Sequence, residues 1–259
     1  MSDNNLAIRL PEPRTLGLDE LYLEQSHCND TDIYLDGAVK LMLSSTNGPI
    51  LDVGCNSGRF AHYLSTLTRR HVYGVDIDKN AVSMANEMYG GTENLHFEVC
   101  NVYDLGKKFR GFGLVSCLMS LHHFDDLAGA LVQMTGVLNT RGIVAIHDWD
   151  RYLGLPQLER CGLEKADIDD VQRAHKRSSE RSVRKLLRKK GILYNPSILT
   201  LFSVMAAYTE KEVAENLKDL GFYTETTSAP DDAKFYLAAY RRWPSRMLHK
   251  FSELTGLNV

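Results

Sequence analysis

The chain has 259 residues, of which 44% are hydrophobic and 24% are charged. This composition is typical of a soluble globular protein with one domain and an appended cap, or with two small domains. The formal net charge of −3 at pH 7 excludes a general electrostatic attraction to nucleic acid or to an anionic membrane, so such a partner would require a local basic patch.

The sequence contains no apolar run of about 18 residues, and its first residues, MSDNNLAIRL, lack the basic and then apolar pattern of a signal segment. We therefore expect a cytoplasmic protein. The cysteines are odd in number and never form a CxxC pair, which argues against a disulfide framework and against a zinc knuckle. We expect reduced thiols at Cys28, Cys55, Cys100, Cys117 and Cys161.

Strand-like and helical patterns alternate between residues 49 and 148. The strand-like runs are PILDVG (49–54), HVYGVDI (71–77), LHFEVCN (95–101), GLVSCLM (113–119) and GIVAIHD (142–148). The helical segments between them are SGRFAHYLSTL (57–67), DKNAVSMANEMYG (78–90) and DLAGALVQMTGVLN (126–139). Nearly continuous apolar strands separated by helices indicate a parallel sheet covered on both faces. Ligands of such doubly wound α/β sheets bind at the carboxyl ends of the strands.

The loop after the first predicted strand has the pattern of a ligand-binding turn. Asp52 lies at the end of that strand, and Gly54 and Gly58 bracket a short turn. Glycines at these places would let a ligand approach the main chain. Ser57 is expected to cap the helix that follows.

This loop does not match the common phosphate-binding motifs. A dinucleotide loop would need glycine where this chain has Asn56 and Arg59, and a P-loop would need a Gly-Lys-Ser/Thr ending, which is absent. The second predicted strand ends in VDID, which places Asp76 at the neighbouring strand end. An acid there can accept both hydroxyls of a ribose, so the pattern indicates a ligand with a ribose and no pyrophosphate.

With these motifs, the sequence resembles the class I S-adenosylmethionine (SAM)-dependent methyltransferases. The resemblance covers residues 45 to 150 through LDVGCNSG, GVDID, CNVYDL and SLHHFDD, and continues more weakly in GFYTETTSAPDDAKFYLAAYR. It implies an α/β fold with a doubly wound, Rossmann-like, mostly parallel seven-stranded sheet. It also implies SAM as cofactor and S-adenosylhomocysteine (SAH) as product.

The same resemblance implies the residues that bind the cofactor. Gly54, Cys55 and Gly58 would line its methionine part, Asp76 would hold the ribose, and Ile77 would pack on adenine. The full expected set is Asp52, Gly54, Cys55, Asn56, Ser57, Gly58, Asp76, Ile77, Asn101, Val102 and Leu118.

Two positions depart from the family pattern. Asn56 replaces the usual middle glycine of the loop, and Asn101 replaces the usual acid after the third strand. Asn101 and Val102 fall where the family contacts the adenine edge, and an asparagine carbonyl can still accept a hydrogen bond from the adenine amino group. Alternatively, Asn101 simply caps the turn before YDLGKKF.

Methyl transfer from a sulfonium is an in-line displacement, so much of the catalysis can come from positioning the acceptor. A base is needed only if the acceptor arrives protonated, and histidine suits that role near pH 7. The ends of the fourth and fifth strands supply the candidates His123, His147, His122 and Asp148, with His123 first. Clustered His and Asp could also hold a divalent metal, but the spacing matches no fixed ligand pattern, so we expect none.

The chain outside the core is expected to determine the substrate. We predict an N-terminal helical cover (1–48), a SAM-binding core (49–150), a helical cap insertion (151–207) and a C-terminal completion of the core (208–259). Tyr22 and Tyr34 are candidates for the acceptor site, although ordinary packing explains each of them as well. Within the cap, RAHKRSSERSVRKLLRKKGILY is strongly basic, with Arg181, Arg184 and Arg188 on one side of a predicted helix.

The basic segment has two interpretations. It is either a solvated face of an amphipathic helix or a lid that contacts an anionic group of a small substrate or an RNA backbone. Our hypothesis is a SAM-dependent methyltransferase that acts on an oxygen or nitrogen of a small, anionic molecule, with no membrane or nucleic-acid partner. The alternatives are an RNA methyltransferase that uses the basic helix and a non-catalytic SAM-binding protein. The oligomeric state and the acceptor are left open.

Overall fold

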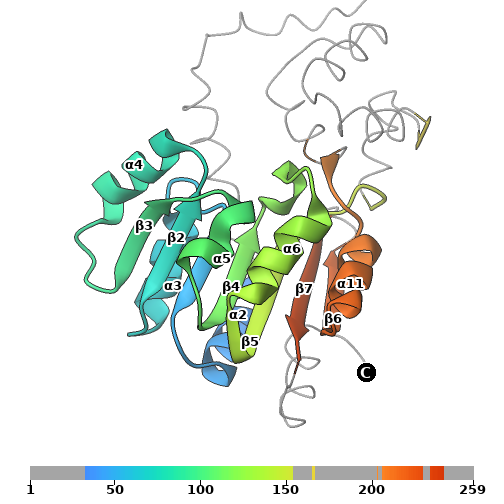
Figure 1. Ribbon diagram of the computed structural model, residues 1–259, viewed down its shortest axis with the longest axis horizontal. Helices are drawn as coiled ribbons and strands as arrows, with labels where there is room; N and C mark the ends of the chain where they lie inside the picture. Colours follow the sequence, from blue (N-terminus) through green and yellow to red (C-terminus); the bar gives the residue numbers. More distant parts are fainter. Residues whose placement is uncertain (1–32, 154–164, 167–202, 204–205, 230–233, 242–259) are drawn as a thin grey trace, which may run out of the picture.

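A computed structural model of the chain describes residues 33–153, 165–166, 203, 206–229 and 234–241. These residues form a seven-stranded sheet in the order β3-β2-β1-β4-β5-β7-β6. The strands are β1 Ile50–Val53, β2 Val72–Asp76, β3 Leu95–Val99, β4 Phe112–Leu118, β5 Leu138–Trp149, β6 Tyr223–Ala229 and β7 Lys234–Tyr240. Strands β1 to β5 pair in parallel, whereas β7 pairs antiparallel with β5 and β6 (Figure 1).

Helices cover both faces of this sheet (Figure 1). The described helices are α2 Ile33–Ser45, α3 Arg59–Leu67, α4 Lys79–Tyr89, α5 Leu105–Lys108, α6 Leu127–Gly136 and α11 Glu210–Asp219, with the 3-10 turns η1 Val102–Asp104 and η2 Leu121–His123. One hydrophobic core joins the sheet to α5, α6 and α11, and a second joins it to α2 and α3. The predicted doubly wound, mostly parallel α/β fold is confirmed.

The central strands are apolar because both of their faces are covered. β1 is buried along its whole length, and every residue of β4 except Leu118 is buried. The helices begin where the sequence places caps: the Asp78 side chain accepts a hydrogen bond from the Asn80 amide at α4, and the Asp126 side chain accepts one from the Gly129 amide at α6. The order of the strands reverses between β1 and β4, so the ends of these two strands are the expected place for a ligand.

One predicted boundary differs from the structure. The helical pattern was expected to run to Asn139, but α6 ends at Gly136 and β5 begins at Leu138. Leu138 is recruited into the sheet because it pairs with Phe112, and the register then shifts before the pairing of Leu114 with Ile143. Apolar periodicity alone cannot show which of two adjacent elements a boundary residue joins.

The end of β5 is joined to the beginning of α11. Asp150 accepts a hydrogen bond from the Glu210 amide (2.8 Å), and Arg151 donates to the Ala207 carbonyl (2.8 Å). Arg151 also forms an ion pair with Glu212 (2.5 Å). The two described ends of the predicted cap (151–207) are therefore fixed next to each other. Most of the predicted cap, and residues 1–32 of the predicted cover, lie outside the described residues.

A capping box begins α11, and its removal should destabilise the fold. The Thr209 hydroxyl accepts a hydrogen bond from the Glu212 amide (3.2 Å), and the Glu212 carboxylate accepts one from the Thr209 amide (2.8 Å). Thr209→Ala should lower the free energy of unfolding by about 1 kcal/mol, as measured by urea unfolding. Thr209→Ser should retain most of the stability. Thr66→Ala is the control because that exposed hydroxyl only bonds a carbonyl of its own helix. Equal stabilities of Thr209→Ala and the wild type would refute the prediction.

Candidate active site

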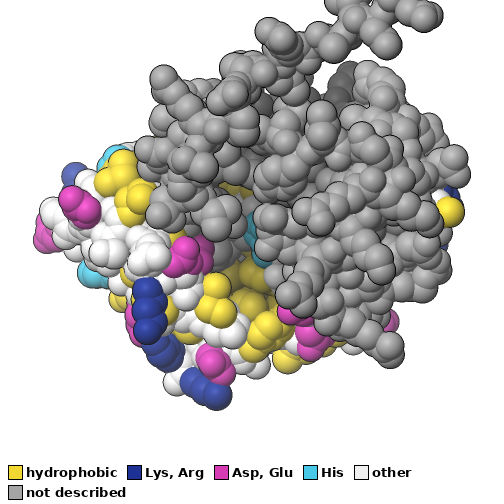
Figure 2. All heavy atoms as spheres, turned by 90° about the horizontal axis from the view of Figure 1, so that it is seen from above, with side chains coloured by type: hydrophobic (Ala, Val, Ile, Leu, Met, Phe, Trp, Pro, Cys, Tyr) yellow, Lys and Arg dark blue, Asp and Glu magenta, His cyan; other side chains and the backbone are white. Residues whose placement is uncertain are grey.

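The candidate site residues gather at the carboxyl edge of the sheet, where β1 to β5 end. Figure 2 looks onto this edge and shows hydrophobic side chains together with histidine and acidic side chains. The residues come from the loop after β1, the end of β2, the turn after β3, η2 after β4, and the end of β5.

The loop after β1 has left-handed backbone at Gly54 (φ 75°), Asn56 (φ 47°) and Gly58 (φ 79°). A Cβ atom on Gly58 would lie 2.5 Å from the Phe97 ring, so only glycine fits under β3 at this position. Asparagine is one of the few other residues that adopt left-handed backbone readily, which explains how Asn56 replaces a glycine. The prediction that Ser57 caps α3 was wrong: Gly58 is the N-cap residue, and no side chain caps this helix.

The Asp76 carboxylate holds the loop from the end of β2. One of its oxygens accepts a hydrogen bond from the Asn56 amide (2.9 Å), and the other accepts one from the Asp78 amide (3.0 Å). Each carboxylate oxygen can accept more than one hydrogen bond, so capacity remains for the predicted ribose hydroxyls. The next side chain, Ile77, is 66% exposed, although it is large and apolar. It leaves an uncovered apolar surface beside Asp76, as expected for a residue that packs on a ligand.

Two buried groups of β1 and the loop have raised pKa values. Burial raises the pKa of Asp52 to about 7; the hydrogen bond from the Ser116 hydroxyl (3.0 Å) opposes this shift, and the charge of Asp76 adds to it. Burial, with the charges of Asp52 and Asp76, also raises the pKa of the Cys55 thiol. Cys55 is therefore protonated near neutral pH and fits a lining role better than a nucleophilic one.

The residues after β3 have a structural role in addition to their predicted one. The Asn101 side-chain carbonyl accepts a hydrogen bond from the Tyr103 amide (3.1 Å) and so caps η1. Val102 is buried. The cap that we considered as the alternative is thus present, and the contact of both residues with adenine stays a prediction.

His122 and Asp148 form a buried pair between the ends of β4 and β5. The Nδ1 atom of His122 lies 2.6 Å from one Asp148 oxygen, and the His122 amide donates to the other oxygen (3.1 Å). The side chains are only 4% and 2% exposed. Burial by itself would raise the pKa of Asp148, but the His122 ring and the amides of His122 and Trp149 outweigh it and lower that pKa. Asp148 is therefore ionised near neutral pH.

The other two predicted histidines lie on different sides of the sheet. The exposed His123 ring is 4.0 Å from the His122 ring. His147 is buried on the opposite face from Asp148, where its ring stacks on Tyr236 (4.0 Å) and its Nδ1 atom lies 3.2 Å from the Phe235 carbonyl. The structure thus brings three of the four catalytic candidates together and separates His147 from them.

His147 faces a small apolar cavity of about 40 Å³ beneath α2. Leu118, which we predicted to contact the cofactor, lines this cavity together with Tyr236. Among the other predicted substrate residues, Tyr34 belongs to α2 by its backbone, whereas Tyr22, Arg181, Arg184 and Arg188 lie outside the described residues.

The sequence reasoning missed several residues that organise the site. The Ser116 hydroxyl donates a hydrogen bond to Asp52, and the Ser120 hydroxyl donates one to the loop after β1. Asp150 and Arg151 join β5 to α11. Serines inside an apolar strand carry no recognisable motif. The HDWDR run, in contrast, offered a signal, because a buried strand that ends in several charged residues requires partners for them.

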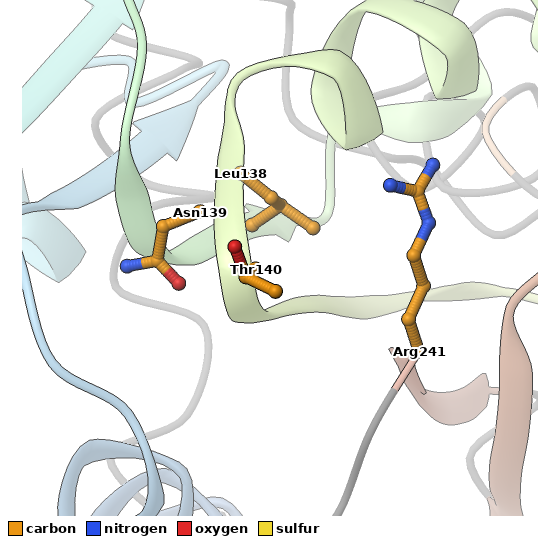
Figure 3. Close-up of a pocket in the computed structure, with 4 residues that line it drawn as sticks. All are labelled: Leu138, Asn139, Thr140 and Arg241. Atoms are coloured by element: carbon orange, nitrogen blue, oxygen red, sulfur yellow. The ribbon is translucent and has the colours of Figure 1, made fainter.

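A separate hollow of about 340 Å³ lies at the opposite edge of the sheet (Figure 3). Its lining residues come from the start of β5 and from the residue after β7: Leu138, Asn139, Thr140 and Arg241. No histidine or acid is among the described residues that line it, and none of the candidate site residues belongs to it.

The described part of the chain contains no group of three or more His, Cys, Asp or Glu side chains that could hold a metal ion. The cysteines within that part, Cys55, Cys100 and Cys117, are free thiols. None of its helices combines the length and the apolar character needed to span a membrane.

The glycine loop, the acid at the end of β2 and the reversal of strand order together match the class of proteins expected from the sequence. A family model described as a methyltransferase domain matches residues 44–238. The chain belongs to this family, the class I SAM-dependent methyltransferases. The match runs from the end of α2 into β7 and so includes every strand end that contributes to the candidate site.

Curated relatives match the chain over shorter stretches. The O-methyltransferase rstn1 of Aspergillus nomiae is 31% identical over 121 residues, which cover 45% of this chain and 54% of that protein. The 27-O-demethylrifamycin SV methyltransferase of Amycolatopsis mediterranei is 30% identical over 130 residues, which cover 49% of this chain and 46% of that protein. The aligned part of the chain thus spans about half the length of these relatives.

Solved structures support the fold at low sequence identity. The plantazolicin methyltransferase BamL, in complex with a triazolic desmethylPZN analog and SAH, has a TM-score of 0.59 at 12% identity, with 86% of this chain and 90% of that chain covered. A SAM-dependent methyltransferase from Aquifex aeolicus has a TM-score of 0.55 at 16% identity, with 88% and 100% covered. Both likenesses extend over most of the two chains.

The raised pKa of Asp52 predicts a pH dependence of stability. The folded chain holds the Asp52 proton more tightly than the unfolded chain, whose aspartate pKa is about 3.9. The stabilising contribution of this group is therefore complete below about pH 4 and is lost as the pH rises through about 7. Between these pH values, the free energy of unfolding should fall less in Asp52→Asn than in the wild type. The difference should be a few kcal/mol at most, because a shift of one pKa unit corresponds to about 1.4 kcal/mol.

Urea unfolding at a series of pH values measures this difference. Asp219→Asn is the control because it removes an exposed carboxylate at the end of α11 and should follow the wild-type profile. If the Asp52→Asn profile runs parallel to that of the wild type, Asp52 does not retain its proton in the folded chain.

Proposed function

We propose that this chain transfers a methyl group from SAM to an oxygen or nitrogen of a small molecule. The observation that carries the proposal is the buried hydrogen-bonded pair of His122 and Asp148. His122 lies two residues after Ser120, whose hydroxyl donates to the Gly54 carbonyl of the glycine loop. An oxygen acceptor is favoured by the relatives, several of which are named O-methyltransferases. A cytoplasmic location and a small-molecule acceptor belong to the same proposal.

The residues of the carboxyl edge fit the cofactor. Gly54 and Gly58 leave the main chain of the loop without side chains at two positions, Asp76 retains acceptor capacity for a ribose, and Ile77 offers an exposed apolar side chain for adenine. Asn101 and Val102 would contact the adenine edge. When bound, SAM supplies a methyl group on a positively charged sulfur.

His122 is the side chain best prepared to accept a proton. Because an ionised carboxylate can only accept hydrogen bonds, Nδ1 of His122 must donate to Asp148, which leaves the lone pair of the neutral ring on Nε2. After protonation, the imidazolium is stabilised by the carboxylate 2.6 Å away. Asp148 thus fixes both the orientation and the tautomer of His122. His123 and His147 remain candidates, and catalysis by positioning alone is the alternative to a base.

Two further candidate functions are less well supported. The basic segment that would bind RNA lies outside the described residues, so no contact in the structure favours an RNA methyltransferase. A non-catalytic SAM-binding protein would have no need of a buried carboxylate that fixes the histidine tautomer. Turnover distinguishes both from the proposal, because the first would methylate RNA and the second would methylate nothing.

Cofactor binding can be tested without knowledge of the acceptor. Calorimetric titration of the full chain should detect binding of SAM and of SAH. Asp76→Ala should weaken it by about 1.5 to 3 kcal/mol, because hydrogen bonds to a charged group are lost. Asp78→Ala is the matched control, since that carboxylate caps α4 and its removal leaves Asp76 in place. Absence of binding by the wild type at millimolar ligand would refute the proposed function.

Turnover tests the role of His122. Incubation with SAM and a panel of phenols, carboxylic acids and amines, with bulk RNA as a separate arm, should give a methylated small molecule together with SAH. With the acceptor found in this way, His122→Gln and Asp148→Asn should each lower kcat about 10² to 10⁴-fold while SAH affinity is retained. His123→Ala and His147→Ala are measured in parallel. Wild-type rates in His122→Gln would contradict a base role for this residue, and methylation of RNA alone would favour the RNA methyltransferase.

A further inference from the structure

The chain makes an unusual turn where β4 ends. Met119 has a left-handed backbone (φ 51°), which is unfavourable for a residue with a long side chain. Such a conformation persists only where the surrounding contacts fix it, and it is enriched at functional sites. Here the contacts come from both neighbouring strands, because β4 lies between β1 and β5.

Two hydrogen bonds fix this turn. The Met119 amide donates to the His147 carbonyl on β5 (2.7 Å). The Ser120 hydroxyl lies 2.9 Å from the Gly54 carbonyl and 3.2 Å from the Leu118 carbonyl. A hydroxyl has a single hydrogen to donate, and the shorter contact is the one to Gly54. The turn therefore links the glycine loop after β1 to the strand that carries Asp148.

Ser120 and Gly54 also fit each other in shape. A Cβ atom on Gly54 would lie 2.5 Å from both Cβ and Oγ of Ser120, which is closer than real contacts allow. Glycine at position 54 is thus required by its left-handed backbone and also by the presence of Ser120. A larger residue at position 54 would therefore displace Ser120.

We propose that Ser120 is a positioning residue for the cofactor: its hydroxyl fixes the peptide group that follows Gly54 and thereby the shape of the glycine loop. A carbonyl oxygen can accept two hydrogen bonds, so the Gly54 carbonyl held by Ser120 can still accept one from an amino or ammonium group of the ligand. This inference rests on the proposed function, because it assumes that the loop binds SAM. It assigns to Ser120 a contribution to cofactor affinity that its residue type alone does not suggest.

Calorimetric titration of the full-length chain with SAH tests this inference. Ser120→Ala should weaken SAH binding about fivefold, the change expected for the loss of one hydrogen bond of ordinary strength. The control is Ser65→Ala, because the hydroxyl of this buried serine, like that of the half-buried Ser120, donates to a carbonyl (2.7 Å to His62), but within α3. Ser65→Ala should bind SAH like the wild type. Thermal unfolding of both variants separates an effect on the ligand from an effect on stability.

A double-mutant cycle gives an independent readout. Gly54→Ala should bind SAH much more weakly than the wild type because of the contact with Ser120. Gly54→Ala/Ser120→Gly removes that contact and should bind at least about fivefold more tightly than the product of the effects of the single variants Gly54→Ala and Ser120→Gly predicts. In steady-state kinetics, Ser120→Ala should raise KM for SAM with little change in kcat.

The outcomes separate this inference from the proposed function. If the wild type does not bind SAH, the proposed function fails, and the inference fails with it. If the wild type binds and Ser120→Ala binds equally well, or if the effects in the cycle are additive, only the role of Ser120 is overturned. A lower melting temperature of Ser120→Ala with unchanged SAH affinity would likewise overturn it, since the serine would then be merely structural.

Discussion

The loop between β1 and α3 has to reverse direction in a space that Phe97 bounds on one side and Ser120 on the other. The space is so narrow that a Cβ atom on Gly58 or on Gly54 would overlap these neighbours. Side chains are thereby excluded at these two positions of the loop, which lies at the carboxyl edge of the sheet. The Asp76 carboxylate then holds the loop through the Asn56 amide, so the acid that we propose to bind a ribose also maintains the shape of the turn beside it.

Two buried aspartates at this edge are in opposite states because their partners differ. Asp52 has one hydroxyl partner, Ser116, and a second carboxylate nearby, so burial dominates and its pKa rises. Asp148 has an imidazole and two backbone amides, which together outweigh an equally complete burial. Asp52 therefore gains or loses its proton near neutral pH, whereas Asp148 keeps a constant negative charge. Only the constant charge can fix the tautomer of a histidine, and it lies next to His122.

The sequence patterns were sufficient to predict strands β1 to β5, helices α3, α4 and α6 and the acid at the end of β2, because apolar periodicity and glycine spacing depend on neighbours along the chain. It was insufficient where contacts join distant segments. The SLHH run could not reveal that His122 turns inward to Asp148 while His123 stays exposed, since that choice depends on β5, 26 residues further on. Ser57 was expected to cap α3 because serine is a good cap, but the left-handed Gly58 takes that position. The role of Arg151 could not be predicted either, because its ion-pair partner Glu212 lies far along the chain.

The joined ends of β5 and α11 fix the two points between which the predicted cap is inserted. Asp150 and Arg151 bind the backbone of Glu210 and Ala207, so the segment between Leu153 and Ala206 leaves and re-enters the core at neighbouring points. Sequence changes within such a segment need not move either anchoring element, because the ion pair of Arg151 with Glu212 and the capping box of α11 lie outside it. The pair of His122 and Asp148 is attached to β5 on the core side of the same junction. Under the proposed function, sequence changes in this segment could therefore alter the acceptor preference while the His122–Asp148 pair and the loop after β1 stay in place.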